Sequence, residues 1–349
     1  MSEFRLNPAT KEWVIIAGER AARPEDFSGE ETEGALERAE TPAWKADCPF
    51  CPGNEHMTPR AVYRDPPLSR EEASETTWRV RIVPNKFPAL NSTRQTEGRD
   101  CGEFFRSIAG VGFHDVLIEN PVHNRFTPVL SREELRRVLE AYRWRYLALR
   151  EDPRVKIVTI FKNHGRTAGT SLIHPHSQII ATPIVPFFLR SDLGVAIRYY
   201  DDSGRCVYSD MTEQELDDGR RIVYQTEHFV AFCPFASKFP YEVWVLPRRA
   251  SPSFGAITAP ELDGLADVLG RVLGALWEGL DKPAFNYVVR TAPIPQENED
   301  YYLWHLEIVP RITTTAGFEL GSGIIINVTV PEENAALLRR VIEARAQRV

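Results

Sequence analysis

The segment HPHSQ at residues 174–178 contains three side chains that could do chemistry together. Alternate residues of an extended segment share one face, so His174, His176 and Gln178 are expected to point the same way. Imidazole can act as a metal ligand or as a nucleophile, because its unperturbed pKa lies near neutrality. The glutamine amide can donate a hydrogen bond to an anionic oxygen. The pattern indicates attack on phosphorus by His176, whereas the plainer interpretation is a set of polar residues at the end of a loop.

The segment NHGRTAGTS at 163–171 supplies groups that suit a phosphate. Gly165 and Gly169 allow backbone amides to approach an anion closely, although a plain turn would also use two glycines. The fixed positive charge of arginine suits a pyrophosphate. Arg20 and Arg23 lie far from this segment in the sequence, and the alternative interpretation is that they are ordinary surface charges. The side chains that we expect to donate to the phosphates are Asn163, Ser171, Arg20 and Arg23.

Cys48 and Cys51 in CPFC have the spacing by which one tight turn presents two thiolates to a tetrahedral ion. His123 and His174 could complete a Cys2His2 set, and four protein ligands would make the site structural rather than catalytic. The cysteines could instead be a redox pair or two buried thiols, His123 a surface residue, and His174 a partner of His176. If zinc does bind His174, it fixes the strand that carries His176.

The composition limits the class of protein. The 349 residues suggest two units at roughly 150 residues each, and 43% hydrophobic residues suffice for a sizeable core. A net charge of −7 gives no global reason to bind nucleic acid or anionic lipid. The chain has no apolar run near the ~20 residues that span a bilayer, no secretory signal, and an odd number of scattered cysteines. We expect a cytoplasmic protein without nucleic-acid or membrane partners, with a surface loop at the acidic stretch 25–46.

A degenerate internal repeat organises the rest of the chain. The tripeptide KFP occurs at 86–88 and again at 238–240, each time before apolar sequence. Each half then has a capping box, in which a hydroxyl and a carboxylate satisfy free amides of a helix's first turn, followed by apolar residues at helical spacing. The capping pairs are Ser131 with Glu134 and Thr258 with Glu261.

A β-like run follows each predicted helix, at 155–161 and at 285–290, and a histidine follows each run. His176 lies 45 residues after the first cap, and His305 lies 47 residues after the second. We therefore predict an α+β fold with two related halves, 1–195 and 196–349, each an antiparallel sheet with a packed helix. The second half lacks the HPH pair, so the chemistry is expected in the first half.

These motifs together resemble the galactose-1-phosphate uridylyltransferase family of the histidine-triad superfamily. The resemblance covers nearly the whole chain and rests on RAARP at 20–24, CPFC at 48–51, NKFPAL at 85–90, His123, FKNHGRTAGTSLIHPHSQ at 161–178 and KFPYEVWVLP at 238–247. It implies two histidine-triad-like halves, commonly in a homodimer, and a two-step exchange. UDP-glucose gives UMP to a histidine and releases glucose 1-phosphate, and galactose 1-phosphate, the hexose 1-phosphate acceptor, then takes the UMP.

The resemblance also implies a role for individual residues. His176 would be transiently nucleotidylated, and Gln178 and Ser171 would contact the phosphates. The nucleotide would be held by Arg20, Arg23, Asn85 and Asn163, and zinc would be held by Cys48, Cys51, His123 and His174.

The C-terminal segment AGFELGSGIIIN departs from the sugar-binding pattern of the best-studied members. Phe318 and Glu319 match its aromatic and acidic positions, and Asn327 stands in for its glutamine, while core packing is the alternative for Phe318. The FELGSG form also resembles the related ADP-glucose phosphorylases, which move AMP from ADP-glucose to phosphate. The segment LWHLEIVP has one histidine, so we expect no second metal. We favour the uridylyltransferase over the phosphorylase, and both over a noncatalytic nucleotide sensor.

Overall fold

The computed structural model describes residues 2–22, 41–67, 77–93, 95 and 98–348. Arg23 and the acidic stretch up to residue 40 lie outside the described residues. The centre of the molecule is one ten-stranded sheet whose neighbouring strands are all antiparallel. Across the sheet the strands are β3 (Tyr63–Asp65), β4 (Val80–Pro84), β7 (Phe113–Ile118), β9 (His176–Thr182), β8 (Ile157–His164), β13 (Phe285–Arg290), β14 (His305–Pro310), β12 (Val243–Pro247), β11 (Phe229–Phe232) and β10 (Ile222–Gln225).

The strand order shows the repeat directly. From one edge to the centre the order is β3-β4-β7-β9-β8, and from the other edge it is β10-β11-β12-β14-β13. The two histidines occupy equivalent places, because His176 begins β9 and His305 begins β14. The predicted α+β fold of related antiparallel halves is confirmed. The halves are joined into one sheet by β8 and β13, which pair from His164 opposite Phe285 to Ile160 opposite Val289.

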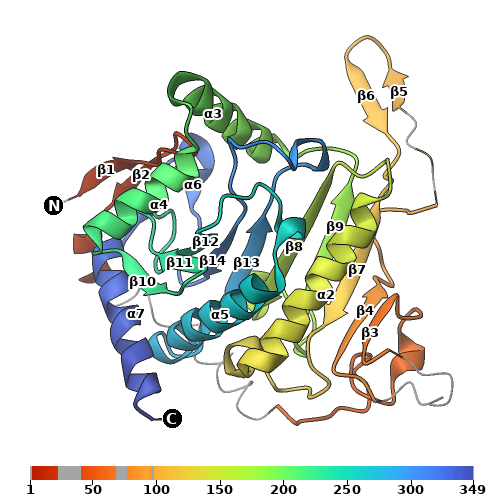
Figure 1. Ribbon diagram of the computed structural model, residues 1–349. Helices are drawn as coiled ribbons and strands as arrows, with labels where there is room; N and C mark the ends of the chain where they lie inside the picture. Colours follow the sequence, from red (N-terminus) through yellow and green to blue (C-terminus); the bar gives the residue numbers. More distant parts are fainter. Residues whose placement is uncertain (1, 23–40, 68–76, 94, 96–97, 349) are drawn as a thin grey trace.

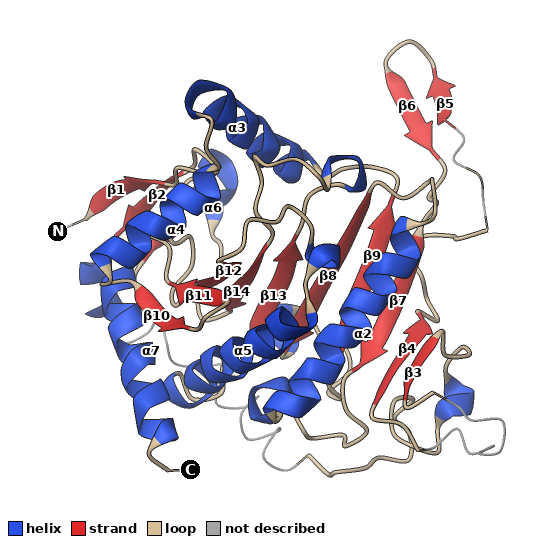
Figure 2. Cartoon of the chain, viewed as in Figure 1, coloured by secondary structure: helices blue, strands red, loops and turns tan. Residues whose placement is uncertain are grey.

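Two long helices, α2 (Arg132–Arg150) and α5 (Ala259–Gly279), cover one face of this sheet and contact each other (Figure 2). Both predicted capping boxes are confirmed. In the first, the Ser131 hydroxyl accepts from the Glu134 backbone N–H at 3.3 Å, and the Glu134 carboxylate accepts from the Ser131 N–H at 2.8 Å. Residues of both helices and of both halves of the sheet share one apolar core. This packing holds the strands that carry the histidines.

We expect Glu134→Gln to lower the free energy of unfolding by about 1 kcal/mol, and the loss should depend on pH. Burial raises the pKa of Glu134, but hydrogen bonds from Arg125 and Ser131 outweigh it and bring the pKa to about 2. A depressed carboxyl pKa gives stability that is present above its ordinary value of 4.5 and is lost as the pH falls toward 2. Urea unfolding of both proteins at neutral and acidic pH checks this. An equal difference at both pH values would contradict it.

The remaining elements surround the central sheet, and the β5–β6 hairpin projects from the first half (Figure 1). The N-terminal strands β1 and β2 form a three-stranded sheet with β15 from the second half, in which β2 lies between β1 and β15. No helix among the described residues is long and apolar enough to cross a membrane. These elements are β1 (Glu3–Leu6), β2 (Trp13–Ile16), η1 (Gly18–Ala22), η2 (Glu55–Met57), β5 (Gly98–Cys101), β6 (Phe105–Ile108), η3 (Thr127–Val129), η4 (Arg166–Ala168), α3 (Phe187–Ser203), α4 (Val207–Asp218), η5 (Phe254–Ala256), η6 (Ile294–Gln296), α6 (Gly317–Ser322), β15 (Ile325–Asn327) and α7 (Pro331–Ala346).

Candidate active site and metal centre

His176, the predicted nucleophile, is held as a neutral ring. It is 8% exposed, and burial lowers its pKa, so the uncharged ring is favoured at neutral pH. Its Nδ1 lies 2.8 Å from the carbonyl oxygen of His174. A carbonyl oxygen can only accept, so Nδ1 carries the proton and Nε2 carries the lone pair. The backbone therefore selects the tautomer in which Nε2 can attack.

A buried ion pair that the sequence analysis missed supports the backbone of His176. The ammonium of Lys162, on β8, lies 2.9 Å from both carboxylate oxygens of Glu119 and 3.0 Å from the carbonyl oxygen of His176. The Thr127 hydroxyl donates to the same carboxylate at 2.7 Å. In the sequence this pair is indicated only by a charged residue at the end of each of two apolar runs: Lys162 ends VKIVTIFK, and Glu119 ends DVLIE. Lys162 thus fixes the first residue of β9 to its neighbouring strand.

We expect Lys162→Met to lower the free energy of unfolding by about 3–5 kcal/mol, because it leaves the Glu119 carboxylate buried without a countercharge. Both side chains are almost fully buried, 1% and 0% exposed, so solvent does not compensate the loss. Urea denaturation measures the effect. The matched control is Lys162→Met combined with Glu119→Gln, which removes both charges and should recover much of the stability. A single variant within about 1 kcal/mol of wild type would contradict this expectation.

The glycine loop lies directly after β8. Gly165 and Gly169 have φ values of 87° and 90°, in the left-handed region that favours glycine. Asn163 lies beside this loop, since a Cβ added at Gly169 would meet its Nδ2 at 3.8 Å. Asn286 of β13, which the sequence analysis also missed, donates to the Asn163 Oδ1 at 2.8 Å and to the carbonyl of Ala168 at 2.9 Å. Asn286, in the second half, therefore stabilises the glycine loop of the first half. It contacts the Oδ1 of Asn163, so the Nδ2 N–H groups of Asn163 take no part in this contact.

Gln178 and Asn85 meet through a third side chain. Gln178 is two residues after His176 on β9, and Asn85 directly follows β4. Between them lies the ring of His114, on β7, with its Nε2 2.8 Å from the Gln178 Oε1 and 3.0 Å from the Asn85 Nδ2. Ser171 is exposed after the glycine loop, and Arg20 is exposed on η1.

The C-terminal residues expected to bind sugar lie on the other half of the molecule. Phe318, on α6, is 50% exposed, and the Glu319 carboxylate accepts from the backbone N–H of Ala316. Asn327 is fully buried in β15, where its Nδ2 donates to the carbonyl of Ser237 at 2.9 Å. In Figure 1, α6 lies with the second-half elements and away from β9, and β15 pairs with β2. The structure does not bring these three residues to His176, and their role in binding sugar stays a prediction.

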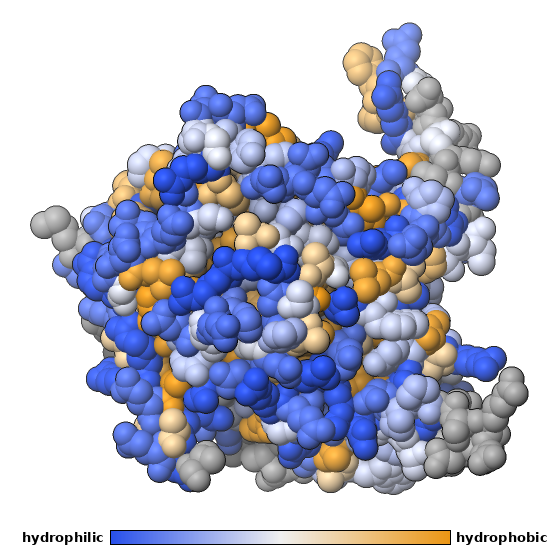
Figure 3. All heavy atoms as spheres, in the orientation of Figure 1, coloured by the Kyte–Doolittle hydropathy of each residue, from blue (hydrophilic) through white to orange (hydrophobic). Residues whose placement is uncertain are grey.

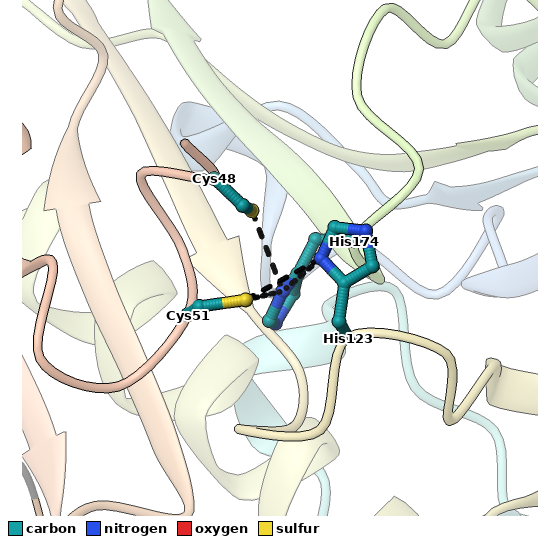
Figure 4. A group of neighbouring side chains, drawn as sticks. All are labelled: Cys48, Cys51, His123 and His174. Atoms are coloured by element: carbon teal, nitrogen blue, oxygen red, sulfur yellow. Dashed lines mark hydrogen bonds between the residues drawn. The ribbon is translucent and has the colours of Figure 1, made fainter. Parts of the chain in front are cut away.

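The four expected metal ligands converge in a buried cluster (Figure 4). Their ligand atoms all lie within 4.8 Å of one another. The Nδ1 atoms of the two imidazoles are 3.2 Å apart, and the sulfur-to-Nδ1 distances are 3.4 Å and 3.7 Å. Bond lengths of about 2.0–2.3 Å to a tetrahedral zinc ion would place its ligand atoms about 3.3–3.8 Å apart. The cluster of Cys48, Cys51, His123 and His174 therefore has the dimensions of a closed four-ligand metal site.

His174 links this cluster to His176. Its Nε2 lies 2.8 Å from the carbonyl oxygen of Asn120 and must donate to it, which leaves the Nδ1 lone pair facing the other ligands. Burial lowers the pKa of His174 to about 3, so the ring is neutral, as a metal ligand must be. The Phe50 ring, between the two cysteines in sequence, packs 6.0 Å from the His174 ring and 5.3 Å from the His176 ring. An ion in this cluster would hold the start of β9 in place.

The equivalent place in the second half has a different character. His305 repeats the backbone contact, with its Nδ1 3.0 Å from the carbonyl of Leu303. Trp244 stacks on its ring at 4.9 Å. Glu307 occupies the position of Gln178, and its carboxylate accepts from Arg290 at 2.8 Å. A carboxylate would repel a phosphate where an amide would bind one, so this place does not repeat the chemistry of the first.

Comparison with known proteins agrees with these features. Residues 1–186 match the model of the galactose-1-phosphate uridyl transferase N-terminal domain, and residues 193–343 match that of its C-terminal domain. An ADP-glucose phosphorylase of Arabidopsis thaliana is 31% identical over 97% of this chain and 93% of its own length. A galactose-1-phosphate uridylyltransferase of Thermotoga maritima is 29% identical over 97% of this chain and 98% of its own.

Solved structures agree over nearly the full length. An ADP-glucose phosphorylase from Arabidopsis thaliana with bound ADP-glucose superposes with a TM-score of 0.80, at 30% identity, over 97% of this chain and 98% of that one. A uridylyltransferase structure superposes with a TM-score of 0.73, at 26% identity, over 99% of each chain. The chain therefore belongs to the galactose-1-phosphate uridyl transferase family.

Proposed function

We propose that this chain is a nucleotidyltransferase that moves UMP between UDP-glucose and galactose 1-phosphate through a uridylyl group on His176. The observation that carries the proposal is the Nδ1 proton donated to the His174 carbonyl, which leaves Nε2 as the nucleophile. Its lone pair forms a bond to the α-phosphorus, and the bond from that phosphorus to the bridging oxygen breaks, which releases glucose 1-phosphate. A phosphate oxygen of galactose 1-phosphate then attacks, and the phosphorus–nitrogen bond breaks.

The surrounding groups fit this chemistry because they stabilise charge without taking protons. The imidazole becomes cationic as the phosphorus–nitrogen bond forms, and the carbonyl of His174 accepts from Nδ1–H throughout. The Gln178 amide is expected to hold a phosphoryl oxygen, and the amides of the glycine loop are expected to hold others. The donors proposed for the phosphates and the nucleotide are Arg20, Arg23, Asn85, Asn163, Gly169, Ser171 and Gln178.

A second candidate is adenylyl transfer from ADP-glucose to inorganic phosphate. It is favoured by the 31% identical ADP-glucose phosphorylase and by the TM-score of 0.80 to the ADP-glucose complex. The same attack by His176 would apply, with AMP in place of UMP.

Intact-protein mass after incubation with each donor separates the two candidates. The protein is incubated with UDP-glucose or with ADP-glucose and kept out of acid, which would cleave a phosphoramidate. A UMP-sized adduct that is removed by galactose 1-phosphate supports the uridylyltransferase. An AMP-sized adduct that is removed by phosphate supports the phosphorylase. If a folded protein binds either donor and forms no adduct, covalent catalysis is wrong.

We propose Zn²⁺ as the ion of the cysteine–histidine cluster, because two thiolates and two imidazoles are the donor set of structural zinc sites. When bound, the ion would join three segments that are far apart in sequence: the CPFC turn, the segment after β7 that carries His123, and the start of β9. Its role would be to position His176 rather than to contact the substrate.

We also propose a homodimer, with the β5–β6 hairpin as a contact between copies. The hairpin projects from the body of the molecule and carries apolar side chains in solvent (Figure 3). Phe104 is 90% exposed and Phe105 is 74% exposed. We expect light scattering to give twice the chain mass of 39.7 kDa, and Phe104→Ser with Phe105→Ser to shift the protein toward the monomer. A monomeric wild type would contradict this.

The cytoplasmic location stays a prediction.

A further inference from the structure

We propose that His114 is a positioning residue that sets the orientation of the Gln178 amide, an inference that rests on the proposed function. His114 is the second residue of β7, which pairs with β9. Its imidazole has neighbours at both nitrogens, and none of them belongs to the metal cluster. The role follows from which nitrogen of this ring carries the proton.

The backbone decides that tautomer. The N–H of Ala89 points at the His114 Nδ1 with a nitrogen-to-nitrogen distance of 3.1 Å. A backbone N–H can only donate, so Nδ1 must hold a lone pair, and the neutral ring carries its proton on Nε2. The Nε2–H then donates to the Gln178 Oε1 at 2.8 Å. In an imidazolium, or in the tautomer with its proton on Nδ1, the Nδ1–H would face the backbone N–H of Ala89, and the two donors would repel each other.

This contact orients Gln178. With its Oε1 accepting from His114, the other end of the amide, the NH2 group, is presented on the side away from the ring. A reversed amide would leave the Nε2–H of His114 without its acceptor and would turn a carbonyl oxygen toward the anionic phosphoryl group. His114 therefore ensures that Gln178 meets the phosphate as a donor.

The backbone of His114 also holds the Asn85 segment. The Asn85 N–H donates to the carbonyl of His114 at 2.8 Å, and its Oδ1 accepts from the Phe87 N–H at 2.9 Å. The Asn85 Nδ2 lies 3.0 Å from the His114 Nε2, but a protonated Nε2 cannot accept from it. His114 thus sets the Gln178 amide through its ring and the position of Asn85 through its backbone carbonyl.

Two conservative variants separate the two ends of the ring. In His114→Asn the side-chain oxygen reaches about as far as Nδ1, so it accepts from Ala89 but cannot reach Gln178. In His114→Gln the amide reaches about as far as Nε2, so it can donate to Gln178 but loses the Ala89 contact. We expect His114→Asn to slow adduct formation on His176 in a single turnover by about 10–100-fold with little change in donor affinity. His114→Gln should recover most of that rate.

Coupling to Gln178 is the decisive comparison. If His114 acts through Gln178, adding His114→Asn to Gln178→Ala should slow adduct formation no further than Gln178→Ala alone. The same factor in both backgrounds, or a His114→Asn protein as fast as wild type, would overturn the proposal. Thermal unfolding of each variant shows whether a loss of rate reflects a loss of fold.

A second measurement does not depend on turnover. Nitrogen-15 NMR of histidine-labelled protein, with the His114 signals assigned by their loss in His114→Asn, should show an unprotonated Nδ1 and a protonated Nε2 at neutral pH. The opposite tautomer or an imidazolium would overturn the proposal even if the enzyme is active. A wild type that forms no adduct with UDP-glucose or ADP-glucose would instead contradict the proposed function, while this spectrum would still test the orientation of the ring.

Discussion

Replacement of His176 by glycine is expected to lower turnover by more than about 10⁴-fold and to abolish the nucleotide adduct. The neighbouring His174 cannot replace the Nε2 lone pair, because its own Nδ1 faces the metal cluster and its Nε2 is bonded to Asn120. Donor binding should persist, since the expected phosphate donors are untouched. Intact mass after incubation with donor and initial rates with both substrates measure the effect.

The chain offers a matched control in its own repeat. His305 begins β14 as His176 begins β9, and it makes the same contact from Nδ1 to a backbone carbonyl. His305→Gly should keep the adduct if the protein folds, which thermal unfolding checks. A labelled His176→Gly protein would disprove the covalent role. If the wild type shows no turnover and the His176→Gly variant binds the donor as tightly as the wild type does, the result favours a noncatalytic nucleotide sensor.

Loss of the cluster metal is expected to have the second largest effect. We expect about one zinc ion per chain by elemental mass spectrometry, and Cys51→Ser should lose it. Removal of the ion by a chelator should lower the free energy of unfolding by at least about 4 kcal/mol, the linkage expected for a ligand present at roughly a thousand times its dissociation constant. The physical reason is that four buried polar groups, whose ligand atoms lie within 4.8 Å of one another, would lose their common partner.

The consequence should extend to the reaction, because the His174 ring would hold the ion and the His174 carbonyl accepts from the Nδ1–H of His176. We expect adduct formation to slow in Cys51→Ser protein that is still folded. Cys206 provides the control: it is a free, partly buried cysteine outside the cluster, so Cys206→Ser should keep its metal and its rate. Unchanged metal content in Cys51→Ser, or a chelator that leaves unfolding and labelling unaffected, would contradict a structural ion at this site.

The sequence by itself determined the features that depend on near neighbours. The capping boxes at Ser131 and Thr258 are complete within four residues, so they could be predicted from the chain and are confirmed. The expected strand repeat holds from His176 to Gln178 but does not include His174, because β9 begins at His176. The similar intervals from cap to histidine, 45 and 47 residues, predicted the related halves, which the strand order confirms. Candidate metal ligands were also visible, because cysteines and histidines are few and only certain spacings suit an ion.

Only the tertiary structure decided which groups meet across strands. His114 and Gln178 are 64 residues apart, and Asn286 and Asn163 are 123 apart, so nothing local in the sequence indicates that they form pairs. The register between strands sets such contacts, and a shift of one residue would turn each side chain to the other face of the sheet. The sequence also does not indicate that β8 and β13 pair and join the two halves, because either strand could have been the edge of a separate sheet. The tautomers of His176 and His114 follow from backbone groups that only the folded chain brings to their rings.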